Sequence, residues 1–159
     1  MAHLSGCGFR LRGSVDVPET LTRVHIDGLG EYAPLAQELR RVLQRSGTLV
    51  VKRDSKPESI IQVSNEQFKR RVLSVDSRGR AAEYELDYRF QFMIVKPDGE
   101  SLVPLQKIQL LRDYRFDPNN VLAADAEEAQ IRKEMISFGV RQMMRRIDSY
   151  MKTHEKPAE

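Results

Sequence analysis

Basic side chains gather around one predicted hairpin turn, and their spacing suits the binding of an anionic group. The turn is 76–80, which carries a glycine between two arginines. Residues near a hairpin turn come close together across the two paired strands. An arginine fork donates two parallel hydrogen bonds to a phosphate or carboxylate. The candidate anion-binding residues are Lys69, Arg70, Arg71, Arg78 and Arg80.

The same cations also fit an ordinary solvated surface, because 31% of the 159 residues are charged. The formal net charge of +3 is too small to indicate nucleic-acid binding by itself. A site for single-stranded nucleic acid would need exposed aromatic rings between the cations. Here Tyr84, Tyr88 and Phe90 fall on a predicted core face instead. We therefore expect no nucleic-acid partner.

Residue types that serve catalysis or metal binding do not occur at useful spacings. His3, His25 and His154 are far apart, and no pair has the spacing of metal ligands. One cysteine excludes both an intramolecular disulfide and a cysteine-based zinc site. The sequence has no Gly-x-Ser-x-Gly elbow and no phosphate-cradling glycine loop. We predict a protein that is not an enzyme and has no cofactor or metal; a hydrolase with a cryptic site is the weakest alternative.

The single cysteine stands in a motif that implies lipid attachment. Leu4-Ser5-Gly6-Cys7 is an apolar residue, two small residues and a cysteine, the pattern at which bacterial lipoprotein precursors are cut. Acyl chains on Cys7 would bind a membrane with about 0.8 kcal/mol per buried CH₂ group. Only Met1-Ala2-His3 precede the motif, so the apolar part of a signal peptide is missing from this sequence. We expect residues 1–7 to be the remnant of a lipoprotein signal, with Cys7 as the lipid anchor.

The elements that would position these residues can be read from hydrophobic periodicity. The clearest is a strand at 83–95, where apolar and polar residues alternate, which predicts one buried and one wet face. Before it lies a strand at 60–75, whose change of parity predicts a bulge near 65–69. A third long strand is predicted at about 105–116. We expect a mixed sheet with 83–95 central.

Nearer the N-terminus, the pattern predicts a strand at 21–27, a helix that begins at Pro34 and stops at Gly47, and a short strand at 48–52. Together with a long C-terminal helix, these elements predict an α+β fold. We expect a two-layer sandwich with a mixed sheet of about four strands and two helices packed on one face.

The C-terminal helix, predicted over about 124–152, has apolar residues on two nearly opposite sides. The sheet should cover the larger stripe. The smaller stripe is a candidate partner interface, unless the first helix or a sheet edge covers it. This stripe and the preceding loop supply the interface candidates Ile131, Met135, Phe138, Asp117, Asn119 and Asn120. Residues 154–159 are expected to form a flexible tail.

Several short motifs, in order, resemble the LPS-assembly lipoprotein LptE family. Cys-Gly-Phe-Arg-Leu-Arg-Gly followed by Val-Pro, within 7–18, is similar to the start of the family's mature chain. Residues 78–86 resemble its turn and "AEY" strand start, and 114–123 its strand-to-helix junction. Its final helix is similar to 127–147. The resemblance covers about residues 7–150.

The resemblance implies a single LptE-like domain over 8–153 on a lipid-anchored protein at the periplasmic side of the outer membrane. Such proteins sit as a plug inside the β-barrel LptD, and the pair inserts lipopolysaccharide into the outer leaflet. The family is also held to bind lipopolysaccharide. Of the candidate cations, only Arg78, in the Arg-Gly turn, matches the family; the others rest on clustering. The alternative from another class is a free periplasmic carrier or chaperone for lipid or an anionic polymer.

Overall fold

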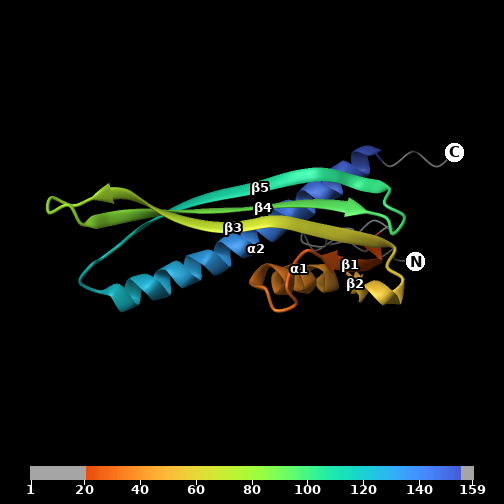
Figure 1. The fold of residues 1–159 in the computed structure, drawn as a ribbon, viewed down its shortest axis with the longest axis horizontal. Helices are drawn as coiled ribbons and strands as arrows, with labels where there is room; N and C mark the ends of the chain where they lie inside the picture. Colours follow the sequence, from red (N-terminus) through yellow and green to blue (C-terminus); the bar gives the residue numbers. More distant parts are fainter. Residues whose placement is uncertain (1–20, 155–159) are drawn as a thin grey trace, which may run out of the picture.

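The computed structural model describes residues 21–154, which form one sheet and two long helices (Figure 1). The predicted α+β fold is confirmed, with five strands in the sheet rather than about four. In chain order the elements are β1 (Arg23–Asp27), α1 (Pro34–Arg45), β2 (Leu49–Val50), the 3-10 turn η2 (Arg53–Ser55), β3 (Ser59–Val75), β4 (Ala81–Val95), β5 (Ser101–Arg115) and α2 (Val121–His154).

The sheet is mixed, with the strand order β2-β1-β3-β4-β5. β1 pairs in parallel with β2 and with β3, because α1 and η2 carry the chain back between them. β3, β4 and β5 are antiparallel neighbours joined by tight turns. β4, which we expected to be central, is an internal strand with a long partner on each side, while β3 occupies the middle of the five.

Two local features fix how β3 runs. Its register with β4 shifts between Ser64 and Gln67, and Asn65 has a φ of 53°. This is the predicted bulge. Gly28, with a φ of +84°, closes the end of β1 against β3 so tightly that a Cβ there would lie 2.0 Å from the carbonyl oxygen of Val63. Glycine is therefore required at this crossing.

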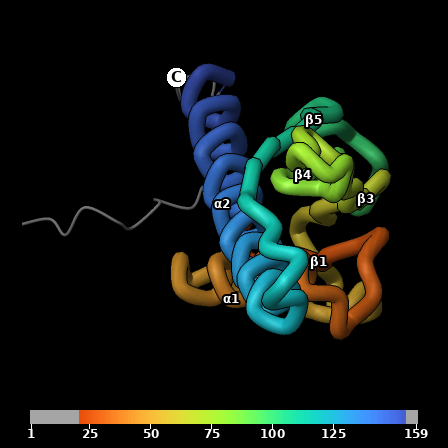
Figure 2. The backbone as a smooth tube through the Cα atoms, turned by 90° about the vertical axis from the view of Figure 1, so that its left-hand side faces the viewer, coloured from red at the N-terminus to blue at the C-terminus, as the bar shows by residue number. Residues whose placement is uncertain are grey.

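Both helices cover the same face of the sheet, as predicted (Figure 2). α2 packs along β5 and against α1. β4 fills the interface with alternating side chains that are almost completely buried: Leu86, Tyr88, Phe90, Phe92 and Ile94. α2 approaches closely at Gly139, where a Cβ would lie only 3.0 Å from Cε1 of Phe90.

The far part of the β3–β4 hairpin extends beyond α1 and β1 (Figure 1). There the sheet has α2 but not α1 beneath it. Residues 72–80 form the hairpin tip, where Val72, Leu73 and Val75 are all about half exposed. α2 ends at His154, which we had assigned to the tail, and residues 155–159 lie outside the described part.

Candidate interaction surfaces

The candidate cations of β3 do not form one cationic patch, because neighbouring residues of a strand point to opposite faces. Arg71 and Lys69 lie on the face without helices, which we call the open face; there Arg71 Nε donates to Glu85 Oε1 over 2.6 Å. Arg70 lies on the helix side, where its Nη1 donates to Glu128 Oε2 of α2 over 2.8 Å. Arg70 therefore points away from its two neighbours.

The hairpin turn is organised by Asp76. Its carboxylate accepts hydrogen bonds of 2.9 Å from the backbone N–H of Arg80 and of Arg78, and a third of 2.9 Å from Arg80 Nε. These bonds, led by the Arg80 N–H, lower the pKa of Asp76. Among residues 21–154, no hydrogen bond or ion pair engages the Arg78 guanidinium. Arg78 is therefore the most available cation of the candidate set.

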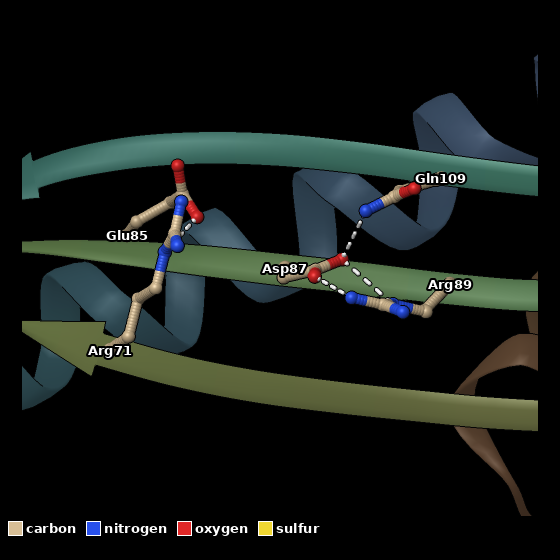
Figure 3. A network of polar contacts seen from close by, with 5 residues as sticks. All are labelled: Arg71, Glu85, Asp87, Arg89 and Gln109. Atoms are coloured by element: carbon tan, nitrogen blue, oxygen red, sulfur yellow. Dashed lines mark hydrogen bonds and ion pairs between the residues drawn. The ribbon is translucent and has the colours of Figure 1, made fainter.

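The open face of β4 carries rows of paired charges (Figure 3). Arg89 donates to both carboxylate oxygens of Asp87, and Gln109 Nε2 of β5 donates to Asp87 Oδ1 over 3.1 Å. The bond from Arg89, more than the one from Gln109, lowers the pKa of Asp87 against the opposing effect of burial. Beside it, Glu85 is only 7% exposed under Arg71. Along β4 this face is therefore polar, and these charges are paired.

A second polar network joins the hairpin to α2 on the helix side. Glu128 accepts hydrogen bonds from Tyr114 Oη (2.5 Å), Arg70 Nη1 (2.8 Å) and Arg132 Nε (2.8 Å). Burial raises the pKa of Glu128, but the three donors together outweigh it and the net pKa is lowered. Burial raises the pKa of Tyr114 to about 12. The only signal for this network in the sequence is the i, i+4 spacing of Glu128 and Arg132.

The side chains of the smaller apolar stripe of α2 differ in how far they are buried. Met135 is 5% exposed and belongs to the core, and Ile131 packs against that core while partly buried. Phe138 is 46% exposed. The guanidinium carbons of Arg141 and Arg145 lie 5.6 and 5.8 Å from the centre of its ring. Phe138 is thus the member of this stripe best placed to meet a partner.

The predicted interface loop is a turn that starts α2. Asp117 Oδ1 accepts the Asn119 N–H over 2.9 Å, and the Asn120 carbonyl accepts the Ala124 N–H over 3.1 Å. The side chains of Asp117, Asn119 and Asn120 are exposed. They lie together at the hairpin end of the molecule, near the base of the hairpin tip, since Phe116 N–H bonds to the Ala82 carbonyl.

Cys7 lies outside the described residues, so the anchor prediction rests on its sequence motif. Within residues 21–154, neither helix combines the length and apolar character needed to cross a bilayer. In the same part of the chain, no three His, Cys, Asp or Glu side chains gather in a way that could hold a metal ion.

Comparisons with known proteins agree with this architecture. The profile of the family LptE, described as lipopolysaccharide-assembly, matches residues 21–147. The LPS-assembly lipoprotein LptE of Photorhabdus laumondii is 30% identical over 143 residues, which cover 90% of this chain and 78% of that protein. That of Pectobacterium atrosepticum is 31% identical over 145 residues, 90% of this chain and 77% of that protein. The solution structure of an uncharacterized lipoprotein B from Nitrosomonas europaea superposes with a TM-score of 0.73 at 32% identity, over 93% of this chain and 97% of that one. This chain therefore belongs to the LptE family.

Proposed function

We propose that this protein is a lipoprotein subunit of the outer-membrane lipopolysaccharide translocon. In this role it plugs an LptD-type β-barrel, assists the assembly of that barrel and helps insert lipopolysaccharide into the outer leaflet, without catalysing a reaction. The observation that carries the proposal is the family match over residues 21–147, with relatives named for LPS assembly along 90% of the chain.

The open face supports a place inside a barrel. The lumen of an outer-membrane barrel is polar, so a plug needs a polar and well-ordered surface. On this face the charges of Arg71 and Glu85, and those of Arg89 and Asp87, already neutralise each other. Contact with the lumen would then desolvate paired charges, which costs less than burying lone ones. We propose that this face, the hairpin tip and the exposed loop residues Asp117, Asn119 and Asn120 meet the barrel wall.

The proposed ligand is lipopolysaccharide, whose lipid A and core phosphates are anionic. Among the described residues, the side chain of Arg78 has no partner, and that of Arg80 pairs only with the partly buried Asp76. With Lys69 and Arg71 they form the proposed binding group. Arg70 is the least available of the five candidates, because Glu128 already holds it.

A charge-reversal experiment tests the ligand. Arg78→Glu with Arg80→Glu should weaken binding of purified lipopolysaccharide more than Arg145→Glu with Arg146→Glu, the matched pair on α2. The difference should shrink with added salt, since exposed charges are screened beyond about 8–10 Å at physiological ionic strength. Equal losses in both variants would indicate diffuse electrostatic attraction and remove the hairpin site.

The proposed anchor is Cys7, which would hold the protein at the periplasmic side of the outer membrane. In the full precursor, Cys7→Ala should abolish lipidation and release the domain while leaving its fold intact. Mass spectrometry of the mature native protein checks this directly, and an unmodified N-terminus would refute the anchor. Lipopolysaccharide binding by a released protein that never associates with a barrel would favour the free periplasmic carrier instead.

A further inference from the structure

β5 is a long edge strand, and the backbone of its outer edge has almost no hydrogen-bond partner among the described residues. Within residues 21–154 it ends the sheet and pairs only with β4 along its 15 residues. Every second residue of an edge strand turns its N–H and C=O away from the sheet. Among the described residues, the only hydrogen bond that reaches this backbone from outside β4 runs from Arg146 Nη1 to the Lys107 carbonyl, over 2.7 Å. The stretch 109–113 is therefore left without a backbone partner on that side.

A groove of about 390 Å³ lies beside this stretch. β5 lines it with Leu110, Leu111 and Arg112, and α2 lines it with side chains of 131–141. Successive strand residues point to opposite faces, so Leu110 and Leu111 flank the sheet on its two sides. A groove that touches both, and α2 as well, runs along the outer edge of β5. The half-exposed Phe138 stands in it.

We propose that the edge of β5 from Gln109 to Asp113, with this groove, binds an extended segment of the partner protein, which joins the sheet as a sixth strand. The chemistry selects this occupant. A row of backbone donors and acceptors at strand spacing is satisfied by another extended backbone, whereas a lipid offers no such row. The inference rests on the proposed function, since the partner is the barrel protein of that proposal.

The groove also constrains the sequence of the added strand. Its side chains must alternate between the two faces of the sheet. Those on the helix side enter the groove beside Leu110, Ile131 and Phe138 and are therefore apolar. Those on the open face lie beside Gln109, Leu111 and Asp113, so we expect polar residues there with an apolar one next to the exposed Leu111.

The rim of the groove adds a charge preference. Arg112 faces Glu134 across the groove, with nitrogen and oxygen 3.9 Å apart. Arg141 lines the same groove and stacks near Phe138 together with Arg145. Within the groove lining, Arg112 and Arg141 stand against the single carboxylate of Glu134, and this excess of one cation favours an acidic residue in the bound segment, next to its apolar ones.

Amide hydrogen exchange on the complex of full chain and barrel is the direct test. In the isolated protein, every second amide of 107–115 should exchange readily; in the complex the same amides should slow by roughly tenfold or more. A strand added to the edge protects alternate amides, which side-chain contact alone does not. Unchanged exchange at these amides in an intact complex overturns the inference and leaves the proposed function standing. Absence of any complex with the barrel overturns both.

Two pairs of variants supply matched controls. Phe138→Glu should weaken the complex about tenfold, equivalent to about 1.4 kcal/mol, while Ser149→Glu, at an exposed position nearer the other end of the same helix, should not. Leu111→Glu should weaken it likewise, compared with Leu105→Glu; these two leucines of β5 are 55% and 52% exposed. If Phe138→Glu lowers the melting temperature, its weaker binding could come from partial unfolding. The comparison of Leu111→Glu with Leu105→Glu then decides whether the strand is added, since both leucine side chains lie outside the core. Equal affinities within that pair would contradict the added strand.

Discussion

The two faces of β4 come from one strand and differ in what holds them. On the helix side, Leu86, Tyr88 and Phe90 are almost completely buried. On the open face, Arg89 donates hydrogen bonds to the carboxylate of Asp87, so this part of the strand surface is polar (Figure 3). The first face gains its free energy from buried apolar area and close packing. The second contributes less to folding, because its ion pairs have solvent-exposed arginines and such pairs are weak. The helix side therefore stabilises the fold, and the open face is the one that we propose for contact with a partner.

The largest expected effect comes from emptying the helix face. Phe90→Ala should lower the free energy of unfolding by about 3–5 kcal/mol, because it leaves a cavity under α2 that the packed neighbours cannot fill. Gln91→Ala, its neighbour on the open face, should cost less than about 1 kcal/mol. Chemical denaturation of the two variants measures both values. Similar losses would contradict the division between the faces.

Overfilling the same interface should have a smaller effect. Gly139→Leu would push a side chain into the Phe90 ring, where even a Cβ would be 3.0 Å away, and should cost about 1–3 kcal/mol. Gly139→Ala is the control: its close contact is offset by the roughly 1 kcal/mol that alanine gains over glycine in a helix. Thermal melting should place Ala near the wild type and Leu well below it. A stable Leu variant would mean that α2 is free to move off the sheet.

The Glu128 network should respond to both mutation and pH. Glu128→Gln weakens the bonds from Arg70, Tyr114 and Arg132 and should cost about 1–3 kcal/mol. The folded-state pKa of Glu128 is lowered, so its contribution is complete above the unfolded pKa of about 4.3 and is lost as pH falls through the folded value. The stability difference between wild type and variant, measured by urea titration across pH 2–7, should therefore shrink on the acidic side. A gap that widens on acidification would contradict this assignment.

The smallest effect on stability belongs to the open face. Asp87→Arg combined with Arg89→Asp keeps the ion pair but reverses its direction. The Arg89 side chain is largely exposed, but that of Asp87 is only 13% exposed and accepts a bond from Gln109, so the free energy of unfolding should fall, by no more than about 1 kcal/mol. The affinity for the barrel should fall as well, since like charges would then meet across the contact. An unchanged dissociation constant for the barrel protein would show that this face is not part of the interface.

Much of the fold followed from local pattern. The alternation of β4 needs only neighbouring residues, and it correctly placed Tyr88, Phe90 and Phe92 in the core. The bulge at Asn65 was visible as a parity slip, and Pro34 and Gly47 marked the ends of α1. These signals are local because backbone conformation and side-chain direction repeat with the period of each element.

The positions of the candidate residues relative to one another depend on contacts between distant segments. The sequence predicted these positions less well than it predicted the elements. The basic run of β3 read as one cluster, but alternation sends Arg70 to α2 and Arg71 to the open face. The stripe of α2 read as one surface, but the rotation of the helix buries Met135 and leaves Phe138 half exposed. The face that a helix buries, and the residue with which a charged side chain pairs, depend on how whole elements pack. No single segment encodes that packing.

Purification of the native protein from the membranes of its cells, with mass spectrometry of whatever remains bound, tests the central claim most directly. The account predicts a stable complex with one outer-membrane β-barrel protein, with lipopolysaccharide retained. The complex should survive Gln91→Ala and lose affinity with the reversed Asp87–Arg89 pair. Recovery of the protein from the outer membrane without a barrel partner would contradict it.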